Sequence, residues 1–192
     1  MLPLLLASSS VYRRELLARL QLPFTCSSPD IDESHHPDES AVELVKRLAE
    51  EKARALAVSY PAHLIIGSDQ VAVLGERIIG KPHTFEKARE QLLASSATSV
   101  TFLTGLALLN SQTGACQVDC VPFTVHMRTL DTARIERYLR AEQPYDCAGS
   151  FKAEGLGVSL FKSTEGPDAT SLIGLPLIRL VDMLLTEGVQ IP

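Results

Sequence analysis

Short apolar runs alternate with segments of helical periodicity over the first half of the chain. An apolar run of four residues predicts a buried strand, and apolar positions three or four apart predict a helix with one buried face. This alternation predicts a mixed α/β protein with an extended sheet. The expected elements are strands over 4–7 and 22–26, a helix over 11–20 with Ser10 as its N-cap, and a helix that a capping box at Ser40 and Glu43 opens and that runs to about Val58.

The most informative run is 63–74, in which Gly67, Ser68, Asp69 and Gln70 interrupt an apolar strand pattern. An acid within a buried strand is costly unless it is paired, hydrated or bound to a metal. Asp69 either caps a turn, as aspartates often do, or presents its carboxylate for base or metal chemistry.

The second half predicts a hairpin and further helices, with turns marked by Gly, Pro and Asn. A loop dense in glycine and polar residues, 146–157, is typical either of a connector or of a ligand-binding loop. The expected elements are a turn at 74–77 returning to 78–79, a helix over 85–95 capped by Thr84, strands over 99–110 and 115–128, a helix capped by Asp131 or Thr132 that ends before Pro144, a strand over 158–161, and a last helix with Pro176 near its first position and Gly188 after its end.

Composition narrows the class of protein. The chain of 192 residues, 45% hydrophobic and 21% charged, fits a single domain over 1–192 with its own core. A formal net charge of −5 argues against nucleic acid as a partner. The first residues lack the basic start of a signal peptide, and no run reaches the roughly 18 apolar residues of a membrane span. We therefore expect no membrane partner, a cytoplasmic location and four free cysteine thiols.

Anion-binding chemistry is expected where the first strand meets the first helix. Ser8, Ser10 and the helix N-terminus offer hydroxyl and N–H donors to a phosphate. Arg13 and Arg14 lie in the first turn, where the helix dipole disfavours cations, so they either face a phosphate or are solvated surface residues. The segment lacks the glycine-rich sequence of a Walker A loop.

Two lysines and a second acid complete the candidate set. Lys52 falls on the apolar stripe of its helix and either snorkels or points into a cleft. Lys81 occupies a Gly-Lys-Pro bend, where it either binds a phosphate or forms a plain ion pair with Asp69. Glu33 belongs to an acidic loop suited to a divalent cation, and the histidines of that loop, His35 and His36, are more typical of plain loop than of a zinc site. Cations for phosphates together with acids for a metal and a water fit hydrolysis of a nucleoside triphosphate.

Five motifs in this order resemble the Maf family of nucleotide pyrophosphatases across nearly the whole chain. They are Leu6-Ala7-Ser8-Ser9-Ser10-x-x-Arg13-Arg14-Glu15-Leu16-Leu17, Asp32-Glu33, Lys52-Ala53, Gly67-Ser68-Asp69-Gln70-Val71 and Gly80-Lys81-Pro82. The resemblance implies an inosine-triphosphate-pyrophosphatase-like fold, in which a long mixed sheet flanked by helices divides two lobes around a nucleotide cleft.

The implied reaction splits the α–β phosphate bond of a nucleoside triphosphate, with a divalent cation (Mg²⁺, Mn²⁺ or Co²⁺) as cofactor. Asp69 is then the catalytic proton acceptor, and Glu33 and Asp69 hold the metal. The substrate phosphates contact Ser8, Ser10, Arg13, Lys52 and Lys81. The resemblance also makes a homodimer plausible.

Three positions bear on the choice of nucleotide. Tyr12, Gln70 and Glu154 are similar to the specificity positions of the branch that acts on 7-methyl-GTP, whereas the branch that acts on UTP and dTTP typically has Thr and Gln in place of Gln70 and Glu154. A carboxylate at Glu154 favours the positive charge of 7-methylguanine, and Tyr12 can stack on it. The alternatives are the same chemistry on UTP, dTTP or another modified nucleotide, and a non-catalytic nucleotide-binding regulator of cell division.

Overall fold

A computed structural model describes residues 2–191. Within these residues, seven strands form a mixed sheet in the order β2-β1-β3-β5-β6-β7, and β4 pairs with β3 off this path. Strand β1 runs parallel to β2 and β3, whereas β4 is antiparallel to β3 and β7 is antiparallel to β6. The mixed α/β class predicted from the sequence is confirmed. The strands are β1 (Leu4–Ala7), β2 (Phe24–Ser27), β3 (Leu64–Leu74), β4 (Arg77–Ile79), β5 (Ser99–Asn110), β6 (Cys116–Met127) and β7 (Phe161–Glu165).

The chain divides into two compact units, and three strands contribute residues to both. The first unit comprises residues up to Gln70, residues 104–121 and residues from Asp168 onward. The second comprises 71–103 and 122–167. The helices of the first unit are α1 (Val11–Ala18), α2 (Ala41–Ala55), α5 (Ala169–Ile173) and α6 (Leu177–Thr186), and those of the second are α3 (Phe85–Ser95), α4 (Thr132–Glu142) and the 3₁₀ helices η1 (Ala148–Ser150) and η2 (Leu156–Leu160).

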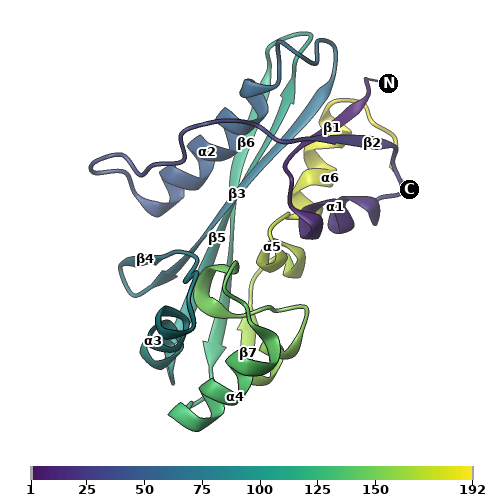
Figure 1. The fold of residues 1–192 in the computed structure, drawn as a ribbon. Helices are drawn as coiled ribbons and strands as arrows, with labels where there is room; N and C mark the ends of the chain where they lie inside the picture. The colour runs from purple at the N-terminus through teal and green to yellow at the C-terminus, as the bar shows by residue number, and fades with distance from the viewer. Residues whose placement is uncertain (1, 192) are drawn as a thin grey trace. The chain divides into compact units, whose positions relative to one another are not determined.

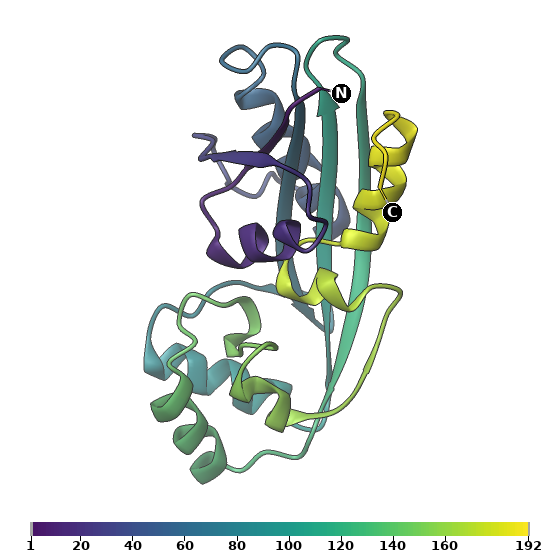
Figure 2. The same ribbon diagram turned by 90° about the vertical axis from the view of Figure 1, so that its right-hand side faces the viewer.

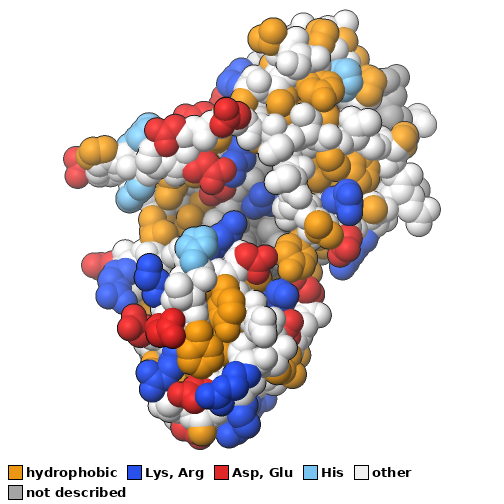
Figure 3. All heavy atoms as spheres, viewed as in Figure 1, with side chains coloured by type: hydrophobic (Ala, Val, Ile, Leu, Met, Phe, Trp, Pro, Cys, Tyr) orange, Lys and Arg blue, Asp and Glu red, His pale blue; other side chains and the backbone are white. Residues whose placement is uncertain are grey.

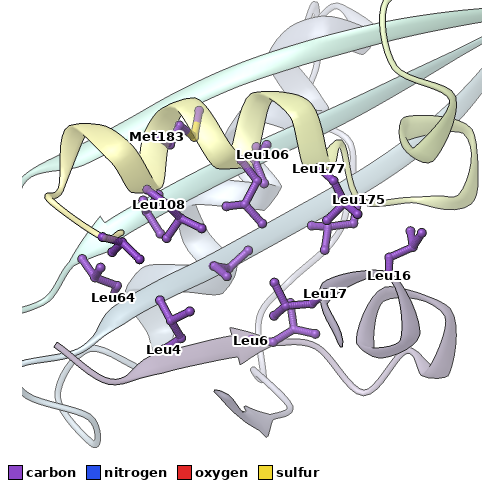
Figure 4. Close-up of a cluster of buried hydrophobic side chains, with 14 residues drawn as sticks. Leu4, Leu6, Leu16, Leu17, Leu64, Leu106, Leu108, Leu175, Leu177 and Met183 are labelled. Carbon is purple, nitrogen blue, oxygen red and sulfur yellow. The ribbon is translucent and has the colours of Figure 1, made fainter. Parts of the chain in front are cut away.

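In the first unit, α1 and α6 cover one face of the sheet and α2 covers the other (Figure 1). Because successive strand residues point to opposite faces, Leu64 and Ile66 pack toward α1 and α6. Figure 4 shows leucines of β1, β5 and both helices meeting in this cluster. Figure 2 shows α6 beside β6, to which it is tied by Arg179, whose Nε lies 2.6 Å from Asp119 Oδ2. The buried members of the hydrophobic cluster beneath α1 and α6 are Leu4, Leu6, Leu16, Leu17, Leu64, Ile66, Leu106, Leu108, Leu175, Leu177, Leu180, Met183, Leu184 and Val189.

Two glycines let α2 approach the opposite face very closely. A Cβ added to Gly67 on β3 would lie 2.0 Å from the carbonyl oxygen of Ala49, and one added to Gly105 on β5 would lie 2.0 Å from that of Val45. Any larger residue at either position would push the helix away. This contact brings Lys52, in the last turns of α2, down to the level of the strand.

The second unit has its own aromatic core. Phe151 packs edge-on against Phe102 and Phe161, with ring centroids 5.3 and 4.8 Å apart. Helix α3 is tied to η1 by the hydroxyl of Ser150, which donates to Gln91 Oε1.

Most of the predicted elements are present, and their caps are confirmed. The Ser40–Glu43 capping box has both of its hydrogen bonds, and Ser10, Thr84 and Asp131 accept from the first turns of their helices. The first two helices end earlier than predicted, at Ala18 and Ala55, and Pro176, predicted near the first position of α6, is its N-cap.

The strand predicted over 158–161 is wrong. Residues 156–160 form the 3₁₀ helix η2, and the strand begins at Phe161. Gly157 explains the difference, because its Cα packs so close to the backbone of Lys152 that an added Cβ would lie 2.2 Å from that residue's carbonyl oxygen. The apolar residues of this segment therefore lie in a loop that folds back on itself and not in the sheet.

Candidate functional site

A buried lysine bridges two carboxylates at the centre of the candidate site. The Nζ of Lys52 lies 2.6 Å from Asp69 Oδ1 and 2.8 Å from Glu33 Oε1. The side chains of Lys52 and Asp69 are only 8% and 12% exposed, whereas that of Glu33 is 60% exposed. Lys52 therefore does not snorkel to solvent. Asp69, inside β3, forms an ion pair with Lys52 instead of capping a turn.

Glu33 is brought to Lys52 by the loop between β2 and α2, which extends from the sheet and returns (Figure 1). Figure 3 shows acidic and histidine side chains on the surface of this loop. Arg47 of α2 anchors it, since Nε and Nη2 donate to Glu39 at 2.6 and 2.8 Å and Nη2 also donates to the carbonyl of Ser34. The guanidinium of Arg47 lowers the pKa of Glu39 to about 2. The ring of His35 is used within the same loop, 2.6 Å from the carbonyl of Glu39.

The serine turn after β1 is built as an N-cap. The hydroxyl of Ser8, which is buried, accepts from the N–H of Ser10 at 3.1 Å, and the hydroxyl of Ser10 accepts from the N–H of Arg13 at 3.4 Å. Both serines therefore order the first turn of α1. Their hydroxyl hydrogens are not used by these bonds, so each serine can still donate to an anion.

Arg13 is half-buried, and its Nε donates to the carbonyl of Gly174 at 2.8 Å. Burial lowers the pKa of Arg13, and the negative charges of Asp69 and Glu33 partly oppose this shift. Arg13 therefore lies within electrostatic range of both carboxylates. The bond to Gly174 does not use the four N–H groups of the two Nη nitrogens, which are the donors that bind phosphate bidentately.

Ser68 and Gln70 flank Asp69 on β3 and point to the opposite face of the sheet. The Nε2 of Gln70 lies 2.7 Å from the carbonyl oxygen of Ser171 and 2.9 Å from Thr104 Oγ1. Because a carbonyl only accepts, these contacts fix Nε2 toward α5 and turn Oε1 away from it. Gln70 is thus held against the α5 backbone, on the other side of the strand from the Lys52–Asp69 pair.

The remaining predicted residues are described by their own elements. Tyr12 is a half-buried residue of α1, and Lys81 and Glu154 are exposed residues of the second unit. The loop that carries Glu154 is held by α4, since Tyr138 Oη accepts from the N–H of Lys152 at 3.1 Å and Glu142 Oε2 accepts from that of Leu156 at 2.6 Å. Burial raises the pKa of Tyr138.

The donor set of the first unit suits a metal that shares its ligands with a substrate. Among residues 2–191, no group of three or more His, Cys, Asp or Glu side chains is placed to hold a metal ion by itself. Glu33 and Asp69 supply two carboxylates, and Mg²⁺ is usually held by one or two carboxylates together with waters and substrate phosphates. Their charges balance those of Lys52 and Arg13, so a triphosphate would bring uncompensated negative charge that a divalent cation can offset.

Sequence reasoning missed several residues that build this site. Arg47 and Glu39 hold the acidic loop, Thr104 contacts Gln70, and Gly174 contacts Arg13. Periodicity gave no signal for them, because each partner lies beyond the three- or four-residue spacing that a helical pattern reports. Only Gly174, a glycine just before the Leu-Pro of the last helix, carried a local hint of special backbone geometry.

Comparison with known proteins decides the family. The family described as "Maf: Maf-like protein" matches residues 3–187. The chain belongs to the Maf family. Three relatives illustrate how similar Maf proteins can be to it, and each is named 7-methyl-GTP pyrophosphatase. They are a protein of Pseudomonas fluorescens (strain Pf0-1), 89% identical over the full length of both chains, one of Pseudomonas aeruginosa, 72% identical over 98% of each chain, and one of Alcanivorax borkumensis, 60% identical over 98% of this chain and 96% of the other.

Within residues 2–191, no helix is long and apolar enough to cross a membrane.

Proposed function

We propose that this Maf protein is a nucleoside triphosphate pyrophosphatase that hydrolyses 7-methyl-GTP to the monophosphate and pyrophosphate. The observation that carries the chemistry is the buried Lys52 held between Asp69 and Glu33. The full-length similarity to proteins named 7-methyl-GTP pyrophosphatase supports the choice of substrate.

Asp69 is the proposed proton acceptor for the attacking water. Lys52 binds its Oδ1, a contact that fixes the carboxylate and leaves Oδ2 unused by that bond. As water attacks the triphosphate, its proton passes to Asp69, the α–β anhydride bond breaks, and pyrophosphate leaves with the bond's electron pair. A carboxylate held by a buried ammonium is already oriented before the substrate arrives.

The proposed phosphate ligands are Ser8, Ser10, Arg13, Lys52 and Lys81. The first four belong to the first unit, where the strand end, the helix N-terminus and two cations offer donors to an anion. Lys81 belongs to the second unit, and its role rests on the family resemblance.

A divalent cation, Mg²⁺, Mn²⁺ or Co²⁺, is the proposed cofactor, with Glu33 and Asp69 as its protein ligands. When bound, it would neutralise charge on the phosphates and polarise the bond to be broken. The exposure of Glu33 lets this carboxylate leave Lys52 for a metal at little cost.

Recognition of the base is assigned to Tyr12, Gln70 and Glu154. A methylated guanine ring carries positive charge, so a carboxylate at Glu154 and an aromatic face at Tyr12 would favour it over unmethylated guanine. The hydrogen bonds of Gln70 to the α5 backbone suggest that this residue acts by shaping the site.

A panel of nucleoside triphosphates tests the proposal directly. The purified full chain is incubated with 7-methyl-GTP, GTP, UTP and dTTP, each with Mg²⁺, Mn²⁺ or Co²⁺ and with EDTA, and released pyrophosphate is measured. We expect the highest kcat/KM for 7-methyl-GTP and loss of turnover in EDTA. A preference for UTP or dTTP would identify that nucleotide, instead of 7-methyl-GTP, as the substrate. Binding of all four nucleotides without pyrophosphate release would favour a non-catalytic regulator of cell division.

Three further expectations accompany this function. A small-molecule nucleotide is the expected partner, in a cytoplasmic protein that does not bind nucleic acid. Residues 1–192 are proposed to act as a single Maf domain, because one family match spans both units. A homodimer is proposed from the family resemblance alone, and light scattering of the purified chain would test it.

A further inference from the structure

The backbone of α5 and of the turn that follows it receives side chains from three separate elements of the first unit. The carbonyl of Gly174 accepts from Arg13 Nε at 2.8 Å and from the hydroxyl of Ser68 at 3.0 Å. The carbonyl of Ser171, one turn earlier, accepts from Gln70 and Thr104. Two of these donors, Arg13 and Gln70, are residues to which the proposed function assigns contact with the nucleotide or choice of base.

Gly174 is the member of this segment that no other residue can replace without strain. Its φ is 120°, a backbone conformation that side chains with a Cβ rarely adopt. A Cβ placed on it would lie 3.4 Å from Arg13 Nε and 3.8 Å from Arg13 Nη2. The same conformation directs its N–H to the carbonyls of Thr170 and Ser171, which closes α5, while its own carbonyl faces Arg13 and Ser68.

The segment is clamped on both sides of Gly174 by one buried acid. Asp168 is 4% exposed, and its Oδ1 accepts from the N–H of Thr170 at 2.8 Å while its Oδ2 accepts from the N–H of Ile178 at 2.8 Å. One carboxylate therefore caps α5 and ties it to the start of α6. The carbonyl of Gly174 is fixed between these two anchors.

We propose that Gly174 is a positioning residue that orients the guanidinium of Arg13 toward the Lys52–Asp69–Glu33 site through its backbone carbonyl. An unrestrained arginine samples many rotamers, and ordering it on substrate binding costs conformational entropy. The bond from Nε removes part of that freedom in advance and leaves the Nη donors for phosphate. This inference deepens the proposed function, because it rests on Arg13 as a phosphate ligand of that same site.

A double-mutant cycle tests the coupling. Gly174→Ala is measured alone and in an Arg13→Ala background, with kcat and KM for 7-methyl-GTP determined for each. We expect Gly174→Ala alone to lower kcat/KM by about 10- to 100-fold, since small misplacements of a positioned group have effects of this size. In the Arg13→Ala background the same change should have almost no further effect, because the group it positions is gone. Equal losses in the two backgrounds would overturn the inference.

Gly188→Ala is the matched control for backbone strain. Gly188 also has a positive φ, 74°, and follows α6, but an added Cβ there would meet nothing within 4 Å. The variant Gly188→Ala should lower the thermal midpoint without changing kcat/KM. A similar loss of kcat/KM in Gly188→Ala would assign the Gly174 effect to strain and would refute positioning. If Gly174→Ala does not fold by circular dichroism, Ser68→Ala, which removes the second donor to the same carbonyl, takes its place in the cycle, with the same two outcomes.

A readout independent of turnover separates this inference from the proposed function. In a ¹H–¹⁵N spectrum, the Nε–H signal of Arg13, identified by its absence in Arg13→Lys, should exchange slowly with water in the wild type and in Gly188→Ala. It should exchange fast in Gly174→Ala. Slow exchange in Gly174→Ala, or fast exchange in the wild type, would contradict the inference. A wild-type chain that releases no pyrophosphate but shows the expected exchange pattern would refute the proposed function alone.

Discussion

The Nζ of Lys52 lies 2.6 Å from Oδ1 of Asp69, and both side chains are almost completely withdrawn from solvent. The pair joins the end of α2 to the middle of β3 and leaves Glu33, which is 60% exposed, as a second partner of the same lysine. A buried ion pair contributes little net stability, but removal of one partner leaves an uncompensated charge. Such an arrangement is more useful for holding a reactive carboxylate than for stabilising a fold.

Substitution of Lys52 should show how much stability is lost when Asp69 is buried without its partner. We expect Lys52→Met to lower the free energy of unfolding by about 3 to 5 kcal/mol, because Asp69 is then buried without its cation. Urea unfolding at neutral pH measures the loss. The double variant Lys52→Met/Asp69→Leu, which removes both charges, should recover most of it. A double variant as unstable as Lys52→Met would show that packing, and not the unpaired charge, causes the loss.

The close contact between α2 and the sheet gives a second prediction. Gly67→Ala places a methyl group where the carbonyl oxygen of Ala49 lies 2.0 Å away, so the helix must move and must carry Lys52 with it. We expect a destabilisation of about 1 to 3 kcal/mol together with lower activity. The control is Gly80→Ala, where an added Cβ meets nothing within 4 Å and φ is not positive, and which should keep its thermal midpoint. Equal midpoints in the two variants would argue against the close contact.

The anchor of the acidic loop should respond to pH. The pKa of Glu39 is held at about 2 in the folded protein, below its ordinary value of 4.5, mainly by hydrogen bonds from Arg47. A depressed carboxyl pKa contributes stability that is present above the ordinary value and is lost as pH falls toward the folded value. The thermal midpoint should therefore decrease as the pH is lowered from about 4.5 to about 2, and this decrease should be smaller in Glu39→Gln. An unchanged pH dependence in Glu39→Gln would mean that other carboxyls govern it.

Discrimination at the base depends on Glu154 in the proposed function. Glu154→Gln removes one negative charge with little change in shape, and it should reduce the preference for 7-methyl-GTP over GTP by about tenfold, because the charge of the methylated ring loses its partner. The ratio of kcat/KM values for the two nucleotides measures the effect. Glu165→Gln, at an exposed acid on β7, is the control and should leave the ratio unchanged. A wild-type ratio in Glu154→Gln would remove this residue from recognition.

Local patterns predicted the elements well, for physical reasons that lie within each segment. The capping box at Ser40 and the cap at Thr84 depend only on residues three positions apart, and the structure shows both. The central strand was recognised from its apolar run, which holds even with Asp69 inside it. Where a segment's structure depends on a distant backbone contact, as at Gly157, the local pattern predicted a strand that does not exist.

In the site, too, local patterns predicted individual residues but not their partners distant in sequence. Lys52 stood out because a lysine on an apolar stripe is unusual, but its partners are 17 and 19 positions away and no local pattern could choose between snorkelling and pairing. The bonds of Gln70 and Arg13 to the backbone near α5 join residues more than 100 positions apart. The roles of Tyr12, Gln70 and Glu154 came only from family resemblance, and they stay predictions.

The role of Asp69 as proton acceptor is the central claim, and one variant tests it most directly. Asp69→Asn keeps the size of the side chain and an oxygen for Lys52, but an amide cannot accept the proton of the attacking water. With 7-methyl-GTP and Mg²⁺ or Mn²⁺, we expect kcat for pyrophosphate release to fall by at least about 100-fold, while circular dichroism stays that of the wild type. A folded Asp69→Asn protein that releases pyrophosphate at the wild-type rate would contradict the account.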